Sequence, residues 1–250
     1  MRTTMLRIAT LNTLVTVAGL LCLGCDRIPG RPGPGPEVVR PEEVLDFDVL
    51  YKTNCSACHG DHGKGGVAIS LANPVYLSLA GEENLRQITS KGVPGKLMPP
   101  FARDAGGMLT NQQVNAIAHG MIEHWGQRDL SAAQDGPPYA AAGSGDPIQG
   151  QQAFAAYCAR CHGANGEGTA ADTTANKTKK IGSIVDGSYL ALISDQALRS
   201  TVIAGRPDEG MPDWRSDGAQ PMTDGQITDI VAWLASKRVA NPGQPYPTHP

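Results

Sequence analysis

The sequence has few aromatic residues and no large excess of charge of either sign. Phe, Trp and Tyr make up 5% of its 250 residues, which is little apolar bulk for a chain long enough for one or two domains. The formal net charge is -3, so the composition does not indicate a nucleic-acid partner or any strongly charged partner. After the first 25 residues, no apolar run is long enough to cross a membrane.

Glycine and proline are abundant instead, with 30 and 19 copies. This composition is typical of small, loop-rich domains joined by linkers. The chain also has six cysteines, and four of them fall in two short strings of the same pattern.

The two strings are Cys-Ser-Ala-Cys-His at residues 55–59 and Cys-Ala-Arg-Cys-His at residues 158–162. A Cys-x-x-Cys-His run is the attachment signature of c-type haem. Two cysteines three residues apart lie on one face of a helix end, where their sulfurs reach two vinyl groups of one porphyrin. The histidine that follows is carried under the ring as an iron ligand. The predicted residues are Cys55, Cys58 and His59 in the first string, and Cys158, Cys161 and His162 in the second. One haem in each domain would supply the missing apolar bulk.

Two other interpretations of the cysteine pairs stay open. Cysteine and histidine clusters bind zinc, and a Cys-x-x-Cys pair also forms redox disulfides. Neither interpretation predicts the histidine in each string or a methionine further along each half.

An internal repeat supports two domains. Each residue of the first string matches the residue 103 positions later, in the second string. The same spacing matches the glycines at 60, 63 and 65 with those at 163, 166 and 168. Further along, the spacing becomes 113. Residues matched at this spacing include Tyr76 and Tyr189, Leu85-Arg86 and Leu198-Arg199, Gly92 and Gly205, Met98-Pro99 and Met211-Pro212, and Thr110 and Thr223. The second half therefore has a ten-residue insertion between Gly168 and Tyr189, in a lysine-rich segment.

The repeat also selects the sixth iron ligands. Met98 and Met211 correspond and each precedes a proline, so we predict them as ligands on the His/Met pattern of cytochromes c. His119 and His124 are rivals in the first half, but the repeat places Ala and Lys at their counterparts. A thioether closes the sixth position and favours an electron carrier over a catalyst.

The N-terminal 25 residues are typical of an export signal, with two arginines before an apolar run. Residues 1–24 are predicted to be a signal peptide, with Cys25 as a lipidated first residue of a bacterial lipoprotein, although Cys22 stands where the lipobox pattern prefers leucine. An uncleaved membrane anchor and a cleaved signal that releases a soluble protein are the alternatives. Residues 25–41 are rich in Pro and Gly and are predicted to be a tether.

Helical periodicity and capping residues predict the remaining organisation. Helices are expected at 42–54, 82–90, 110–125, 147–157, 195–204 and 223–234. The first domain would span 42–127 and the second 147–240, joined by a linker at 128–146 and followed by a disordered tail at 241–250.

Together these features resemble class I c-type cytochromes, here as a tandem dihaem protein over about residues 45–238. The resemblance implies an all-α fold of two small cytochrome c domains, each with a few helices wrapped around one covalently bound haem. It also implies that a glycine on the first helix of each domain faces an aromatic residue on the last, which Gly150 and Trp233 match. In the first domain Phe47 takes the glycine position and Gly120 the aromatic one, so we predict a swap of bulk with the two residues in contact.

The resemblance further implies a proline carbonyl that accepts a hydrogen bond from the proximal histidine. Pro74 is the candidate for His59, while Gly187 occupies the matching position in the second domain, so no acceptor is assigned to His162.

The function implied is electron transfer between redox partners on the outer, periplasmic face of a bacterial cytoplasmic membrane. The chain would act as a lipid-anchored shuttle or as a subunit of a respiratory or photosynthetic complex, and would itself be no enzyme. The alternatives are a dihaem enzyme, such as a peroxidase or a sulfur-compound dehydrogenase, and a structural subunit whose haems serve folding.

Overall fold

The computed structural model describes residues 35, 38–127, 135–170, 180–215 and 220–242. Backbone contacts divide the chain into one unit of residues 1–41 and another of residues 42–250, and the fold below is that of the second unit. The predicted signal peptide, Cys25 and most of the tether lie outside the described residues. In the part that is described, no helix is both long and apolar enough to cross a membrane.

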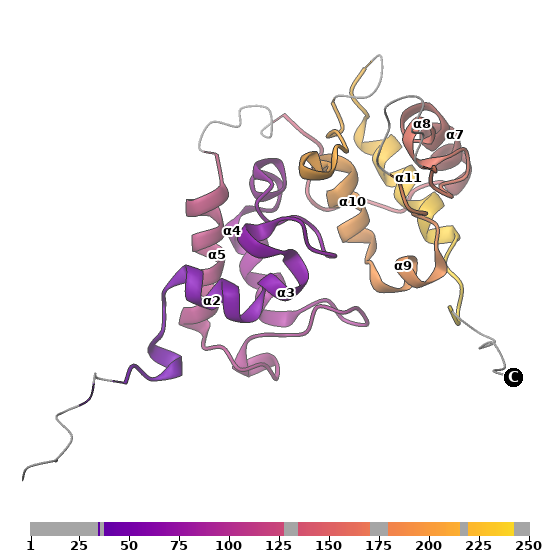
Figure 1. Cartoon of the computed structure of the whole chain (residues 1–250). Coiled ribbons are helices and arrows are strands. Elements are labelled where there is room, and N and C mark those ends of the chain that lie inside the picture. The colour runs from indigo at the N-terminus through magenta and orange to yellow at the C-terminus, as the bar shows by residue number, and fades with distance from the viewer. Residues whose placement is uncertain (1–34, 36–37, 128–134, 171–179, 216–219, 243–250) are drawn as a thin grey trace, which may run out of the picture. The chain divides into compact units, whose positions relative to one another are not determined.

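The described chain is helical (Figure 1). The first half contains η2 (Pro41–Glu43), α2 (Phe47–Asn54), α3 (Ser56–His59), η3 (Asp61–Gly63), α4 (Pro74–Lys91), η4 (Arg103–Ala105) and α5 (Asn111–Trp125). The second half contains α7 (Pro147–Tyr157), α8 (Ala159–His162), α9 (Gly187–Leu192), α10 (Asp195–Ala204), η5 (Pro207–Glu209) and α11 (Asp224–Ser236). The described residues form only isolated β-bridges and no named strand. The predicted all-α fold is confirmed.

Side-chain caps fix where the main helices begin. Thr110 and Thr223 each accept from the backbone N–H three residues on, and the glutamine there reaches back to complete a capping box. Asp146 and Ser194 cap α7 and α10 with the side chain alone, which accepts from a backbone N–H of the first turn. The helix starts predicted at Thr110, Pro147, Asp195 and Thr223 therefore agree with the structure to within a residue.

Two helix predictions differ from the structure. The helix expected at 42–54 begins only at Phe47, because Asp46 adopts an extended conformation and caps it. The helix expected from Glu82 is the second part of α4, which starts at Pro74 and is broken at Gly81, where φ is +67°. The second half has the same break between α9 and α10, so both halves have one interrupted helix at this place.

The first and last helices of each half cross at a glycine. A Cβ atom at Gly120 would lie 2.2 Å from the Phe47 ring, and one at Gly150 would lie 2.9 Å from the Cβ of Trp233. The predicted contact between Phe47 and Gly120 is thus confirmed. One bulky residue and one glycine let α2 pack on α5 and α7 pack on α11.

Each half has its own hydrophobic core, and matched positions of the repeat are buried alike. Leu77 and its counterpart Leu190 are both fully buried. Leu85 and its counterpart Leu198 are almost fully buried.

Candidate functional site

The two haem strings have the same backbone structure. Cys55 and Cys158 have φ, ψ of -119°, -34° and -119°, -32°, and each carbonyl accepts from the N–H of its string's histidine at 3.0 Å. The second cysteine of each string also donates to this first carbonyl, at 3.2 Å in Cys58 and 3.1 Å in Cys161. One helical turn thus brings both cysteines and the histidine together, as the spacing predicts.

A glycine ends each string in a conformation that other residues rarely adopt. Gly60 and Gly163 have φ of +82° and +83°. A Cβ atom at Gly60 would lie 1.9 Å from the carbonyl oxygen of Lys64, so the loop folds back tightly over the string. All six glycines that the repeat shares after the histidines have a positive φ, between +75° and +87°, which explains why glycine stands at each of them.

The imidazole of His59 is held in one orientation. It is buried, and its Nδ1 lies 2.8 Å from the carbonyl oxygen of Ile69. A carbonyl accepts only, so Nδ1 carries the proton and Nε2 keeps its lone pair for a metal. Burial lowers the pKa of His59, partly offset by this hydrogen bond, and a neutral imidazole is the form that binds iron.

The prediction that Pro74 accepts this hydrogen bond is wrong. Pro74 is the first residue of α4, where its carbonyl belongs to the helix backbone. The chain instead brings Ile69 to the histidine because Ala68 donates to the carbonyl of Cys58 at 2.9 Å.

His162 has a different environment. It is half-buried, and burial lowers its pKa. Its buried Nδ1 has no hydrogen-bond partner among the residues that the structure describes. The proximal histidines of the two halves therefore differ, although their strings do not.

The two predicted methionine ligands lie in matching loops. Gly92 ends α4 and Gly205 ends α10, both with φ of +65°. A Cβ atom at either glycine would lie 2.6 Å from the carbonyl oxygen of the predicted ligand, Met98 or Met211. The Met-Pro backbone thus passes directly over the helix end in both halves, and both methionines are half-buried.

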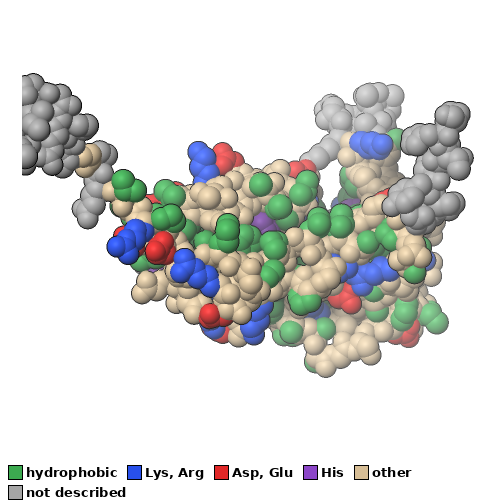
Figure 2. Space-filling view, turned by 90° about the horizontal axis from the view of Figure 1, so that it is seen from below, with side chains coloured by type: hydrophobic (Ala, Val, Ile, Leu, Met, Phe, Trp, Pro, Cys, Tyr) green, Lys and Arg blue, Asp and Glu red, His purple; other side chains and the backbone are tan. Residues whose placement is uncertain are grey.

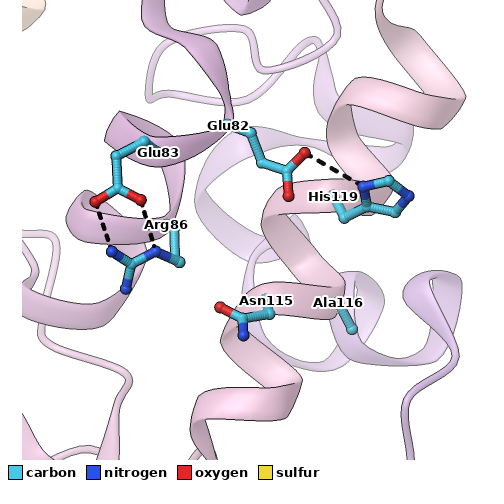
Figure 3. A pocket seen from close by; sticks show the side chains of 6 residues that line it. All are labelled: Glu82, Glu83, Arg86, Asn115, Ala116 and His119. Carbon is cyan, nitrogen blue, oxygen red and sulfur yellow. Dashed lines mark hydrogen bonds and ion pairs between the residues drawn. The ribbon is translucent and has the colours of Figure 1, made fainter.

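The rival histidines lie elsewhere. His119 is on the exposed face of α5, with Nδ1 3.2 Å from Glu82 and Nε2 3.8 Å from Glu123. It lines a surface hollow of about 590 Å³ together with Glu82, Glu83, Arg86, Asn115 and Ala116 (Figure 3). His124 packs its ring on Phe47 at the helix crossing. No residue of a haem string or Met-Pro loop lines this hollow.

The other interpretations of the cysteine pairs gain no support. The four described cysteines are free, and within the described ranges no group of three or more His, Cys, Asp or Glu side chains is arranged to hold a metal ion. Burial, with a smaller contribution from Cys58, raises the pKa of Cys55 to about 12.

Exposed apolar side chains and buried donors elsewhere in the two halves are of the kinds that suit an apolar group with acidic substituents, as haem is. Val67 and Leu97 are 87% and 68% exposed, one just after the first string and one next to Met98. On the face seen from below, hydrophobic side chains are spread between charged ones (Figure 2). Among the described residues of the second half, two buried donors lack a hydrogen-bond partner, Nε of Arg206 and Nε1 of Trp233, although another nitrogen of Arg206 donates to the carbonyl of Gly66 at 3.2 Å. Such donors suit a propionate carboxylate.

Comparison with known families identifies both halves. The family described as cytochrome c matches residues 148–237. The family described as cytochrome c oxidase, cbb3-type, subunit III, matches residues 42–119.

Similar proteins agree with this assignment. The cbb3-type cytochrome c oxidase subunit FixP of Sinorhizobium medicae is 28% identical over 195 residues, which cover 71% of this chain and 58% of that protein. Subunit CcoP of Rubrivivax gelatinosus is also 28% identical, over 56% of this chain and 41% of its own. The chain therefore spans about half the length of these relatives.

Among solved structures, a chain of the Kuenenia stuttgartiensis reducing HAO-like protein complex Kustc0457/Kustc0458 is 18% identical. It matches 81% of this chain and 100% of its own, with a TM-score of 0.44.

The matched strings, the shared Met-Pro loops and the two family matches lead to one assignment. This chain consists of two cytochrome c domains in tandem and belongs to the c-type cytochromes, which carry one covalent haem c in each domain.

Proposed function

We propose that this protein carries electrons and does not itself catalyse a reaction at its haems. The observation that carries the proposal is that the two Met-Pro loops have the same geometry. Each loop passes over the glycine that ends a helix, Gly92 after α4 and Gly205 after α10. Haem c supplies a centre that gains and loses one electron, and the protein decides whether anything else can bind to it.

Each residue of a site has a defined role in this proposal. Cys55 and Cys58 fix the first haem (haem 1), His59 binds its iron from one side, and Met98 binds from the other. For the second haem (haem 2), the corresponding residues are Cys158, Cys161, His162 and Met211. Thioether ligands favour the reduced state and deny the sixth position to oxygen or peroxide.

The partners and location are part of the same proposal. Because its relatives are subunits of cbb3-type oxidases, we assign the chain to electron delivery at a membrane respiratory complex, on the periplasmic side of the cytoplasmic membrane. Cys25 would carry the lipid that anchors it. A Cys25→Ser variant that is released from membranes supports the lipid, and one that stays bound favours an uncleaved anchor. Release of the unaltered chain into the periplasm would indicate the soluble form.

Spectroscopy of the haem-loaded chain tests the electron-carrier role. We expect two haems per chain, both low-spin and both with the absorption band of iron bound to methionine sulfur. Met98→Ala and Met211→Ala should each remove one half of that band and open one haem to carbon monoxide or cyanide. His119→Ala serves as the matched control and should change neither. A high-spin haem that binds peroxide in the unaltered protein would instead support a dihaem enzyme.

A further inference from the structure

Asn73 joins the two domains from a buried position. Its side-chain oxygen caps α4 by accepting from the N–H of Val75 at 2.9 Å. Its side-chain amide donates to the carbonyls of two residues of the second domain, Ala204 at 2.9 Å and Gly205 at 3.3 Å, where α10 ends. One buried side chain thus caps the start of a helix in the first domain and binds the end of a helix in the second.

Apolar side chains surround these hydrogen bonds. Ala204 is buried and packs in the hydrophobic core of the first domain. In the other direction, Val75 and Leu79 of α4 pack on the core of the second domain. The polar contacts of Asn73 therefore lie in an apolar interface, where hydrogen bonds are electrostatically stronger than in water.

Arg206 makes a second link between the domains, in the loop of the predicted ligand Met211. The two residues form a β-bridge, in which Arg206 donates to the carbonyl of Met211 at 2.9 Å and accepts from its N–H at 3.0 Å. The guanidinium of Arg206 donates to the carbonyl of Gly66 in the first domain at 3.2 Å. In the first domain, Val93 has the matching place and donates in the same way to the carbonyl of Met98, at 2.9 Å. A Met-Pro loop thus folds without an arginine here, and the side chain of Arg206 serves the contact between domains.

Gly66 lies directly on the first haem string. A Cβ atom there would be 2.3 Å from the carbonyl oxygen of Cys58 and 2.5 Å from the carbonyl carbon of His59. Three residues further on, the carbonyl of Ile69 accepts from Nδ1 of His59 at 2.8 Å. The segment 65–73 therefore contacts both the predicted proximal ligand of haem 1 and the second domain.

We propose that Asn73 and Arg206 are positioning residues, which lock the two domains together at the segment 65–73. Electrons then pass between the two haems across this fixed contact. From His59 to Met211, covalent bonds, packed backbone and the hydrogen bonds of Arg206 make a continuous path. Each transfer oxidises one iron from Fe(II) to Fe(III) and reduces the other from Fe(III) to Fe(II), and no atom is transferred. The inference rests on the proposed ligation of the irons by His59 and Met211.

The internal repeat provides two substitutions that the fold accepts. Asp186 has the place of Asn73 in the second domain and caps α9 with its carboxylate, so Asn73→Asp keeps the helix cap. The new carboxylate faces two carbonyl oxygens that it cannot hydrogen-bond, and this opens the contact. Arg206→Val copies Val93 and removes the donor to Gly66.

Transfer between the haems is measured in a Met98→His background at low protein concentration. Replacing a thioether ligand by imidazole lowers the potential of haem 1, so an electron delivered by a pulse of photoreductant moves from haem 1 to haem 2. Loss of the sulfur–iron absorption band of haem 2 reports its arrival. The double variant Asn73→Asp with Arg206→Val should slow this step by about tenfold or more, because it loses a charge-assisted hydrogen bond and two buried ones. Without them the domains are held mainly by the chain that joins them, and transfer depends on their encounters.

Arg238→Gln is the matched control. Arg238 donates to the carbonyls of Leu190 and Ile193, both at 3.0 Å and both in its own domain, so the variant should leave the transfer rate unchanged. Small-angle X-ray scattering of the same holoproteins gives a readout that does not depend on electron transfer. The double variant should have a larger radius of gyration than the unaltered chain, and Arg238→Gln should not.

Arg206→Lys tests the role of the donor itself. The ammonium keeps a donor for the carbonyl of Gly66, so this variant should slow the transfer less than Arg206→Val does. Equal transfer rates in the double variant and the unaltered chain would overturn the proposal. Equal radii of gyration would also overturn it, because the two residues would then not hold the domains together. Failure of the proposed function appears differently, as a haem in the unaltered protein that lacks His/Met ligation in the spectrum.

Discussion

The helix crossings of the two domains solve one packing problem in opposite ways. In the first domain, the bulky residue is Phe47 on the first helix and the glycine is Gly120 on the last; in the second, the glycine is Gly150 on the first helix and the aromatic residue is Trp233 on the last. The crossing requires a bulky side chain on one helix and a glycine on the other. Either helix can carry the glycine. Total volume at the contact is thus what the fold specifies.

The arginines at matched positions of the repeat teach the opposite lesson. Arg86 is exposed and pairs with Glu83 on its own helix. Arg199 is 2% exposed and donates to the carbonyls of Pro138 and Tyr139, to Thr228 and to Asp224. The same residue type at matched positions of the repeat therefore has two roles. Arg86 is a surface charge in the first domain, whereas Arg199 is buried in the second and hydrogen-bonds to the linker.

The largest effect is expected at the tighter crossing. A Cβ atom at Gly150 would lie 1.9 Å from the carbonyl oxygen of Asp229, and a backbone atom of α11 cannot turn aside. Gly150→Val should therefore lower the free energy of unfolding by more than about 3 kcal/mol. Denaturant unfolding of the haem-loaded chain, followed by tryptophan fluorescence, measures this loss. Gly143→Ala is the control and should change it little, because a Cβ atom at Gly143 would meet no other atom within 4 Å.

The next effect separates the two arginines. Arg199→Ala removes the donors that pair with buried carbonyls and leaves Asp224 without its partner, so it should cost about 3 kcal/mol. Arg86→Ala removes an exposed, solvent-screened pair and should lower the free energy of unfolding far less than Arg199→Ala does. The same unfolding measurement compares the two variants. Equal losses would show that the burial of Arg199 contributes nothing to stability.

A smaller effect is expected at the crossing of the first domain. A Cβ atom at Gly120 would meet the ring of Phe47, and a side chain can shift where a backbone cannot. Gly120→Ala should cost about 1–2 kcal/mol. The double variant Phe47→Gly with Gly120→Trp recreates the arrangement of the second domain, and its loss should be smaller than the sum of the two single losses by at least about 0.5 kcal/mol. Strict additivity would contradict the idea that total volume governs the crossing.

The smallest effect is expected at His119, whose ion pairs are exposed. His119→Ala should change the free energy of unfolding by less than about 0.5 kcal/mol and leave both haem potentials where they are. A redox titration of the variant checks this. A shift in the potential of haem 1 would reopen the choice between His119 and Met98 as its ligand.

Much of the fold follows from local chemistry that the sequence displays. The capping boxes at Thr110 and Thr223, the glycines that end α4 and α10, and the periodicity of the last helices all act within a few residues. Even the contact of Phe47 with Gly120 was predictable, because the second domain provides an internal template. The break of α4 at Gly81 and the late start of α2 were not predicted, since each depends on a single backbone conformation.

The proximal hydrogen bonds show why the rest could not be predicted. The residue type at Pro74 suggested an acceptor, but any carbonyl serves, and the chain path alone brings Ile69 to the histidine. In the same way, the repeat aligns Arg199 with Arg86 without showing that the linker returns to bury only one of them.

By itself, the sequence determined that there are two cytochrome c domains, where their strings and methionine loops lie, and where α5, α7, α10 and α11 begin, because these depend on residue type and short spacing. Only the tertiary structure decided which carbonyl meets His59 and which arginine is buried. Those outcomes depend on which distant backbone segments pass next to the histidine or the arginine. The residue types do not reveal this, because nearly every residue offers the same backbone carbonyl.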